Sequence, residues 1–268
     1  MNVLNVLRYV FVTVSVMFVL SMSSFAYAHF EWLVPHTWQL EKGQKTRIIL
    51  AYGHSFPTSE QLIDYRTYSL SMTTPDGHKQ TLKPVVKEKW VEAEAQIQQS
   101  GIYLFTSEVL GEISKWVKTT EGYKDSSKEK IVEEDVVEKW WVYRLCKSVV
   151  RAGKDGGGYS RVLGGKIEII PLDDPTNIRC GEMLKVKVLF QGKLLSDSPV
   201  YSVYGGFKAP SHDDWYYQKV TTDKEGTAEI NIDKKGAWIL FADKSIKNIK
   251  GQPYNCKAHG CRLTFYVP

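Results

Sequence analysis

The sequence predicts an all-β protein with two tandem β-sandwich domains of the immunoglobulin-like type behind a cleaved signal peptide. Three observations support this fold class. Short runs rich in Val, Ile, Thr and Tyr are separated by Gly, Pro and Asp along the chain. The 268 residues include 8 Trp and 15 Tyr, side chains that suit the half-buried faces of sheets. A proline-bounded join at Pro171–Pro175 divides the chain into two parts of ordinary domain size.

Residues 1–28 have the pattern of an export signal. Arg8 is the only charged side chain, Tyr9–Leu20 form an apolar core, and Ala26-Tyr27-Ala28 is a small-x-small cleavage site. Cleavage after Ala28 leaves His29 as the first residue of a periplasmic or secreted protein. No later segment approaches the roughly 18 apolar residues that a membrane span needs, so we expect no transmembrane segment in the mature chain.

The N-terminal domain is expected over residues 29–170. A β-turn is expected at Thr74-Pro75-Asp76-Gly77, where Pro and Gly stand at the positions that turn geometry favours. The predicted strands are Lys45–Tyr52, Thr67–Thr73, Trp90–Ile97, Gly101–Ser107 and Lys166–Ile170.

One stretch of this domain departs from the strand pattern. Between Ser126 and Arg151, the apolar residues Val132, Val136 and Trp140 recur at three-to-four spacing. This spacing predicts a short helix near 127–140. Residues 141–150 fit a strand equally well, and the sequence alone does not decide between the two.

The C-terminal domain is expected over residues 171–268, as an immunoglobulin-like or transthyretin-like sandwich. A flexible loop precedes it, because Gly153–Gly165 contains six glycines. The predicted strands are Leu184–Phe190, Pro199–Tyr204, Thr227–Ile232, Ala237–Ala242 and Arg262–Val267.

The charge pattern argues against nucleic-acid binding. The chain has 35 basic and 30 acidic side chains, and removal of Arg8 with the signal leaves a net charge of about +4. Lysines alternate with acidic residues, as in Lys87-Glu88-Lys89. Because a nucleic-acid binder concentrates positive charge on one face, we interpret these runs as solvated surface.

His29 and His54 are the candidate metal ligands. A histidine at a free amino terminus offers its α-amine and its Nδ1, and such nitrogen ligands suit late first-row metals. His54 follows a predicted strand, between Gly53 and Pro57, which indicate a tight turn and a stiff exit. Together the two residues would form a brace of one amine and two imidazoles. The alternative is that His29 merely follows the cleavage site and His54 makes a hydrogen bond across a turn.

Three further histidines are weaker candidates. His36 is near His29 in sequence, His212 lies in a polar loop, and His259 lies between two cysteines. Trp32 and Trp38 are candidates to shield the site, although burial in a sandwich core is the commoner use of such residues.

The four cysteines predict disulfides, because an exported protein meets an oxidising compartment. Cys256 and Cys261 could close a small ring that presents His259 on a constrained loop. A thiolate metal site made from these three residues is the rival interpretation. A bond between Cys146 and Cys180 would tie the two domains together.

No catalytic motif is present in the sequence. It has no Gly-x-Ser-x-Gly elbow, no phosphate-binding loop and no paired catalytic carboxylates. We therefore predict a protein that is not an enzyme.

A set of motifs runs through nearly the whole mature chain: His29–Pro35, Gly53–Pro57, Tyr143–Lys147, Ile167–Pro171, Asp174-Pro175, Leu189–Leu194, Thr222–Gly226, Gly236–Ile239 and Leu263–Val267. Their order and spacing resemble a family of exported bacterial proteins classed as a domain of unknown function, which usually has alanine at the position of Cys146. Some members are encoded with energy-coupling-factor nickel/cobalt transporters as periplasmic accessory components. The resemblance implies Ni(II) or Co(II) as the bound ion and such a membrane transporter as the partner.

The expected function is thus a metal-binding accessory protein that delivers Ni(II) or Co(II) to a membrane uptake transporter. Two alternatives remain open at this point. One is a non-catalytic adhesion or carbohydrate-binding module, and the other is a Cu(II) enzyme that uses the same histidine brace for oxidation.

Overall fold

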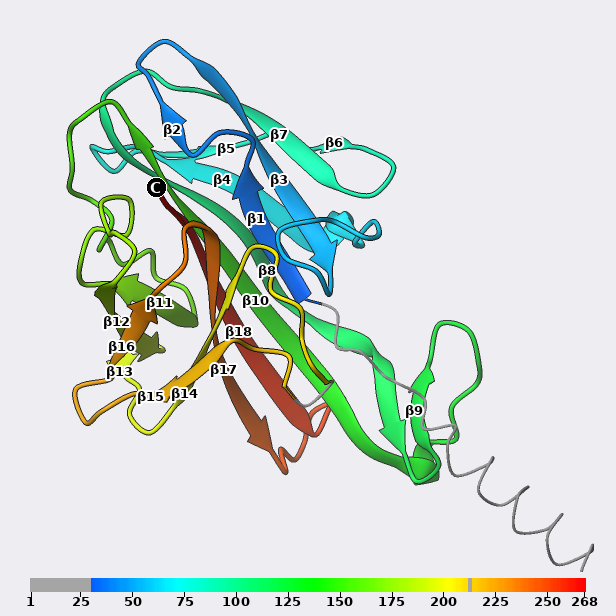
Figure 1. Ribbon diagram of the computed structural model, residues 1–268. Coiled ribbons are helices and arrows are strands. Elements are labelled where there is room, and N and C mark those ends of the chain that lie inside the picture. The colour runs from blue at the N-terminus through cyan, green and yellow to red at the C-terminus, as the bar shows by residue number, and fades with distance from the viewer. Residues whose placement is uncertain (1–29, 212–213) are drawn as a thin grey trace, which may run out of the picture.

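A computed structural model describes residues 30–211 and 214–268, and this part of the chain is built from β-strands (Figure 1). The helical content of the described residues is two single-turn 3₁₀ helices, at Tyr65–Thr67 and Glu133–Asp135. Strands form where apolar and polar residues alternate: β16 (Thr227–Ile232) buries every second side chain. The predicted all-β class is confirmed.

The strands form three sheets that lie in layers (Figure 1). The first sheet has the order β1 (Phe30–Pro35), β3 (Lys45–Gly53), β7 (Val91–Gln96) and β6 (Val85–Val86). The third contains β11 (Ile167–Pro171), β12 (Glu182–Phe190) and β13 (Lys193–Leu194), with β16 paired to β12.

The large sheet between them has ten strands. Its order is β15 (Gln218–Thr221), β14 (Pro199–Tyr204), β17 (Gly236–Lys247), β18 (Cys256–Val267), β10 (Val136–Ala152), β8 (Gly101–Thr119), β4 (Tyr68–Thr73) and β5 (Lys79–Thr81). In addition, β2 (Gln39–Leu40) pairs with β10, and β9 (Gly122–Asp125) pairs with β8.

Each face of the large sheet carries its own hydrophobic core. On one face, Trp238, Leu240 and Phe265 pack with the apolar residues of β11, β12 and β16. On the other face, Phe105 packs with strands β3 and β7, and Phe241 packs against β1. This layering confirms the predicted β-sandwich packing.

The large sheet contains strands from both halves of the chain. It is continuous because β10 and β18 pair in parallel, from Trp140 with Cys256 to Ser148 with Thr264. The predicted domain boundary at residue 170 falls inside β11, which pairs with β12. The division into domains 29–170 and 171–268 stays a prediction.

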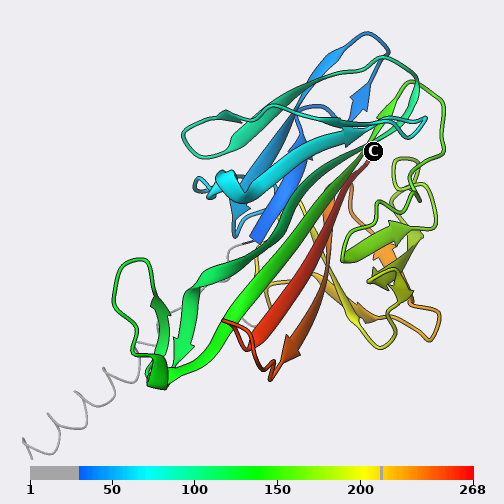
Figure 2. The same ribbon diagram turned by 180° about the vertical axis from the view of Figure 1, so that it is seen from behind.

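The helix expected near 127–140 is wrong. A 3₁₀ turn at 133–135 leads into the long strand β10, which forms a projecting arm with β8 and β9 (Figure 2). The pairing of β10 with β8 shifts register between Val136 and Glu138, between Lys139 and Trp141, and between Val142 and Arg144. Each irregularity interrupts the alternation of buried and exposed residues, so apolar residues fall at three-to-four spacing as they do in a helix.

The predicted disulfides are not formed, and all four cysteines are free thiols. Cys256 and Cys261 lie on the same strand, β18, five residues apart. Five residues of extended chain span about 16 Å and place the two side chains on opposite faces, whereas bonded cysteines have Cα atoms only about 5.5 Å apart. Cys146 is buried in β10, and Cys180 is exposed in the loop before β12.

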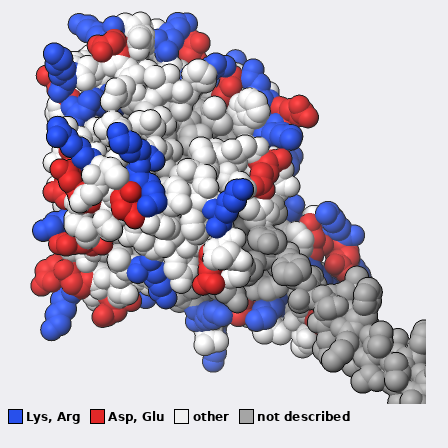
Figure 3. All heavy atoms as spheres, in the orientation of Figure 1, with Lys and Arg blue, Asp and Glu red and all other residues white. Residues whose placement is uncertain are grey.

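The predicted signal peptide, residues 1–28, lies outside the described residues. In the part of the chain that the structure describes, no helix is long and apolar enough to cross a membrane. Basic and acidic side chains are intermixed on the face seen in Figure 3, in line with the solvated surface expected from the sequence.

Candidate metal centre at the start of the first strand

Strand β1 is held on both of its edges. One edge pairs with β3 along the whole strand, from Phe30 with Gly53 to Pro35 with Ile48. On the other edge, the buried hydroxyl of Thr264 donates a hydrogen bond of 2.6 Å to the Leu33 carbonyl of β1. The backbone that follows position 29 is therefore fixed in place.

His54 stands where β3 ends, on a loop tied by hydrogen bonds. The Thr58 amide donates to the Ser55 carbonyl at 2.8 Å, and the Glu60 amide donates back to the Tyr52 carbonyl at 3.0 Å. The indole of Trp32 in β1 donates to the Pro57 carbonyl at 3.2 Å. These bonds join the loop both to itself and to β1, so the backbone beside His54 is well ordered.

The imidazole of His54 is oriented by a carboxylate. Its Nδ1 lies 2.8 Å from Oε2 of Glu60, and about a quarter of the His54 side chain is exposed. Burial alone would raise the pKa of Glu60, but hydrogen bonds from His54 and Ser55 outweigh it and the pKa lies below its usual value. An ionised carboxylate only accepts hydrogen bonds, so the neutral imidazole carries its proton on Nδ1.

Gly53 allows Glu60 to come this close. A Cβ at Gly53 would lie 2.9 Å from both Cγ and Cδ of Glu60, which is shorter than any ordinary carbon contact. The absence of a side chain at this position therefore shapes the contact between His54 and Glu60.

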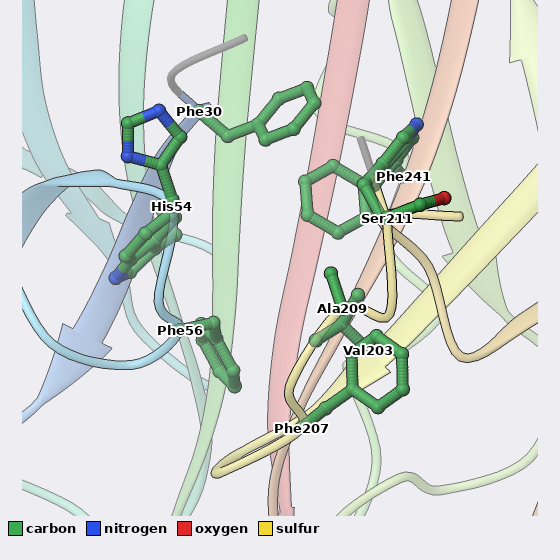
Figure 4. Close-up of a pocket in the computed structure, with 10 residues that line it drawn as sticks. Phe30, His54, Phe56, Val203, Phe207, Ala209, Ser211 and Phe241 are labelled. Carbon is green, nitrogen blue, oxygen red and sulfur yellow. The ribbon is translucent and has the colours of Figure 1, made fainter. Parts of the chain in front are cut away.

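Beside His54 lies a cavity of about 140 Å³. Figure 4 shows His54, Phe30 and Phe56 along one side and Phe207, Ala209 and Ser211 along the other. Six aromatic rings line it: Phe30, Trp32, Phe56, Phe207, Trp215 and Phe241. The cavity wall thus combines β1 and the loop after β3 with β17 and the segment between β14 and β15.

The other histidines that the structure describes lie elsewhere. His36 is exposed at the far end of β1, where its amide donates to the Arg47 carbonyl. His259 is buried on the opposite face of the large sheet, packed against Trp141 and Phe190. Burial is the main cause that lowers the pKa of His259, which favours the neutral imidazole. Neither residue is brought near His54.

His29 and His212, two of the predicted ligands, lie outside the described residues. Their chain neighbours are informative, because Phe30 and Ser211 both line the cavity beside His54. Among residues 30–211 and 214–268, no group of three or more His, Cys, Asp and Glu side chains is arranged to hold a metal ion.

Sequence reasoning missed Glu60 and most of the ring cluster. Of the two tryptophans expected to shield the site, Trp32 lines the cavity beside His54, whereas Trp38 stacks on Tyr266. The only local signal for Glu60 is a carboxylate on the same short, proline-containing loop as His54.

A family model described as a domain of unknown function, DUF4198, matches residues 26–244. No curated protein matches the sequence. Similar solved structures include Salmonella alpha-2-macroglobulin reacted with methylamine, at 8% identity and a TM-score of 0.26, covering 92% of this chain and 16% of that one. The adhesin InvE of Yersinia pseudotuberculosis gives 9% identity and a TM-score of 0.25, covering 88% of this chain and 59% of that one.

A DUF4785 family protein from Legionella pneumophila gives 8% identity and a TM-score of 0.27, covering 82% of this chain and 53% of that one. The chain spans less than two thirds of each of these three proteins. TM-scores this low carry no argument about function.

Proposed function

The chain belongs to the DUF4198 family, whose description assigns no activity, and we propose from the geometry of the site that it binds a late first-row metal ion at its mature amino terminus. The ligands are the α-amine and Nδ1 of His29 and the Nε2 of His54. The ion is a cargo, Ni(II) or Co(II), and Cu(II) suits the same nitrogen ligands.

The observation that carries this proposal is the pairing of Phe30 with Gly53. Phe30 is bonded directly to His29, and Gly53 is bonded directly to His54. Each histidine is therefore one residue, or about 3.8 Å of chain, beyond the same registered pair.

The contact between His54 and Glu60 supports the same function. Metal-binding histidines generally donate their second ring nitrogen to a carboxylate or carbonyl, which fixes the ring and raises its basicity. Here the distance is 2.8 Å and the pKa of the carboxyl lies below its usual value, so the orienting group is charged at neutral pH.

The proposed role is delivery of the ion to a membrane transporter of the energy-coupling-factor type. Two features support it: the export signal expected over residues 1–28, and the resemblance to exported proteins encoded with nickel/cobalt transporters. A site with a small number of protein ligands suits such a role, because the open coordination positions let the ion exchange.

Calorimetric titration with Ni(II), Co(II) and Cu(II) tests the proposal. The protein that begins at His29 should bind at least one of these ions tightly. One extra residue before His29 should weaken binding at least tenfold, and so should His54→Ala. His78→Ala, at an exposed turn, is the matched control and should change nothing.

Equal affinities with and without the extra residue would exclude the amine as a ligand. If none of the ions binds tightly to the protein that begins at His29, the proposal fails and the adhesion module becomes the better hypothesis.

A further inference from the structure

One wall of the cavity beside His54 consists of three aromatic rings in mutual contact. The ring of Phe30 lies 4.7 Å from that of Trp215 and 5.2 Å from that of Phe241. The rings of Trp215 and Phe241 are 5.0 Å apart and meet edge to face. Aromatic rings at these separations attract one another, so the three side chains restrain each other's positions.

A buried cation on the neighbouring strand β18 holds the same rings. The guanidinium of Arg262 lies 5.6 Å from the ring centre of Phe30 and 5.0 Å from that of Phe241. Its Nη1 donates a hydrogen bond of 2.9 Å to Oδ1 of Asp243, which fixes the guanidinium in turn. Because cation–π attraction adds to the contacts between the rings, this wall is formed before any ligand arrives.

The size of the cavity matches one aromatic ring. A protein cavity of about 150 Å³ lined by apolar side chains takes up benzene, and this cavity has about 140 Å³. Its walls favour an aromatic ring over an aliphatic one, because edge-to-face contacts such as that between Trp32 and Phe56, at 5.7 Å, add to the burial of area. Ala209, which lines the cavity on the side opposite Phe56 (Figure 4), is exposed to solvent.

The burial of the lining rings favours a small molecule over a partner protein. Trp32, Phe56 and Phe241 are each at most 5% exposed, so these rings offer contact area inside the cavity and little on the outer surface. A stable protein interface needs about 800 Å² from each partner, whereas a small ligand gains most of its contacts within one cavity.

We propose that the cavity beside His54 binds a small molecule through one six-membered aromatic ring. The ring lies between Phe30, Phe56 and Phe241 and makes edge-to-face or offset contacts with them. This inference is independent of the proposed metal function, because its contacts come from the ring wall and need no metal ion.

Phenol, cyclohexanol and cyclopentanol form a matched set of probes. Each has one ring and one hydroxyl, and only phenol is aromatic. Cyclopentanol has one carbon fewer than phenol, so weak binding of both alcohols cannot result from their size. Titrated by NMR into metal-free exported protein, phenol should bind about tenfold more tightly than either alcohol. Nuclear Overhauser effects should join its ring protons to the methyl groups of Val203 and Ala209, which line the cavity.

Two tryptophan substitutions locate the bound ring. Ala209→Trp fills the cavity from its exposed wall and should bring the affinity of phenol down to that of the alcohols. Lys208→Trp, at an exposed neighbour that does not line the cavity, should leave the preference for phenol unchanged.

Three results would overturn this inference. The first is equal affinity for phenol and the two alcohols, and the second is a preference for phenol that survives Ala209→Trp. The third is tighter binding of the blocked tripeptide Gly-Phe-Gly than of phenol, which would indicate a peptide as the occupant. None of these results bears on the metal titration, so the two proposals fail separately.

Discussion

The substitution Gly53→Ala isolates the contact between His54 and Glu60 without changing either residue. Gly53 does not have a left-handed backbone conformation, so an alanine meets no conformational penalty there. Its one steric conflict is with the Glu60 side chain, whose Cγ and Cδ would lie 2.9 Å from the new methyl group.

The size of the effect follows from these distances. To restore an ordinary carbon contact, the Glu60 side chain must withdraw by about 0.5 Å or more, which takes its carboxylate from 2.8 Å to beyond good hydrogen-bond range of Nδ1. Both side chains are partly exposed, so the free energy of unfolding should fall by no more than about 1 kcal/mol. Loss of such an orienting partner typically lowers metal affinity about 10- to 100-fold.

Two measurements check this prediction. Calorimetry should show the loss of metal affinity, and nitrogen NMR of metal-free protein should show His54 shift from the Nδ1–H tautomer toward the Nε2–H tautomer. Gly156→Ala is the matched control, because a Cβ there meets nothing closer than 3.5 Å. If Gly53→Ala leaves both the tautomer and the affinity as in the wild type, Glu60 does not orient the ligand.

Three further predictions concern the rest of the fold. Thr264→Val removes the buried hydrogen bond between β18 and β1, so urea denaturation should show a free energy of unfolding lower by about 1–2 kcal/mol. Burial lowers the pKa of Lys147, so between that pKa and about 10.4 the unfolded chain binds more protons at this site, and the stability of the wild type relative to that of Lys147→Met should rise with pH. Burial raises the pKa of the Cys261 thiol to about 11, and the exposed Cys180 alone should react quickly with a thiol reagent in native protein. All four thiols should react after denaturation without reductant, whereas a count of two would indicate a disulfide.

The sequence correctly predicts strands whose pairing with their neighbours is regular. Pro199–Tyr204 and Thr227–Ile232 are observed with the predicted bounds, because regular pairing lets alternation and flanking turn residues mark both ends. Strand β10 was mistaken in part for a helix because its register with β8 shifts three times, and a single sequence carries no record of its partner strand. Local pattern rules therefore fail at irregular pairing.

The residues of the candidate site likewise divide into those that local sequence features indicate and those that only the folded chain brings together. His54 could be found from Gly53 and Pro57, because a strand end and a stiff exit are local features. Glu60 could not, because the loop must first fold back on Tyr52 before the carboxylate reaches the imidazole. The cavity was out of reach, because its walls join residues about two hundred positions apart, such as Phe30 and Phe241.

The wall of the cavity beside His54 takes residues from both sides of the predicted boundary near residue 170. Phe30 and His54 come from the first half of the chain, whereas Phe207, Trp215 and Phe241 come from the second. The parallel pairing of β10 with β18 holds these walls together, since it makes one sheet from strands of both halves. The family match over residues 26–244 spans every residue of this wall, from before Phe30 to just beyond Phe241. A first half that folded alone would retain His54 and Glu60 but would lose the wall that faces them, so the site belongs to the joined sheet.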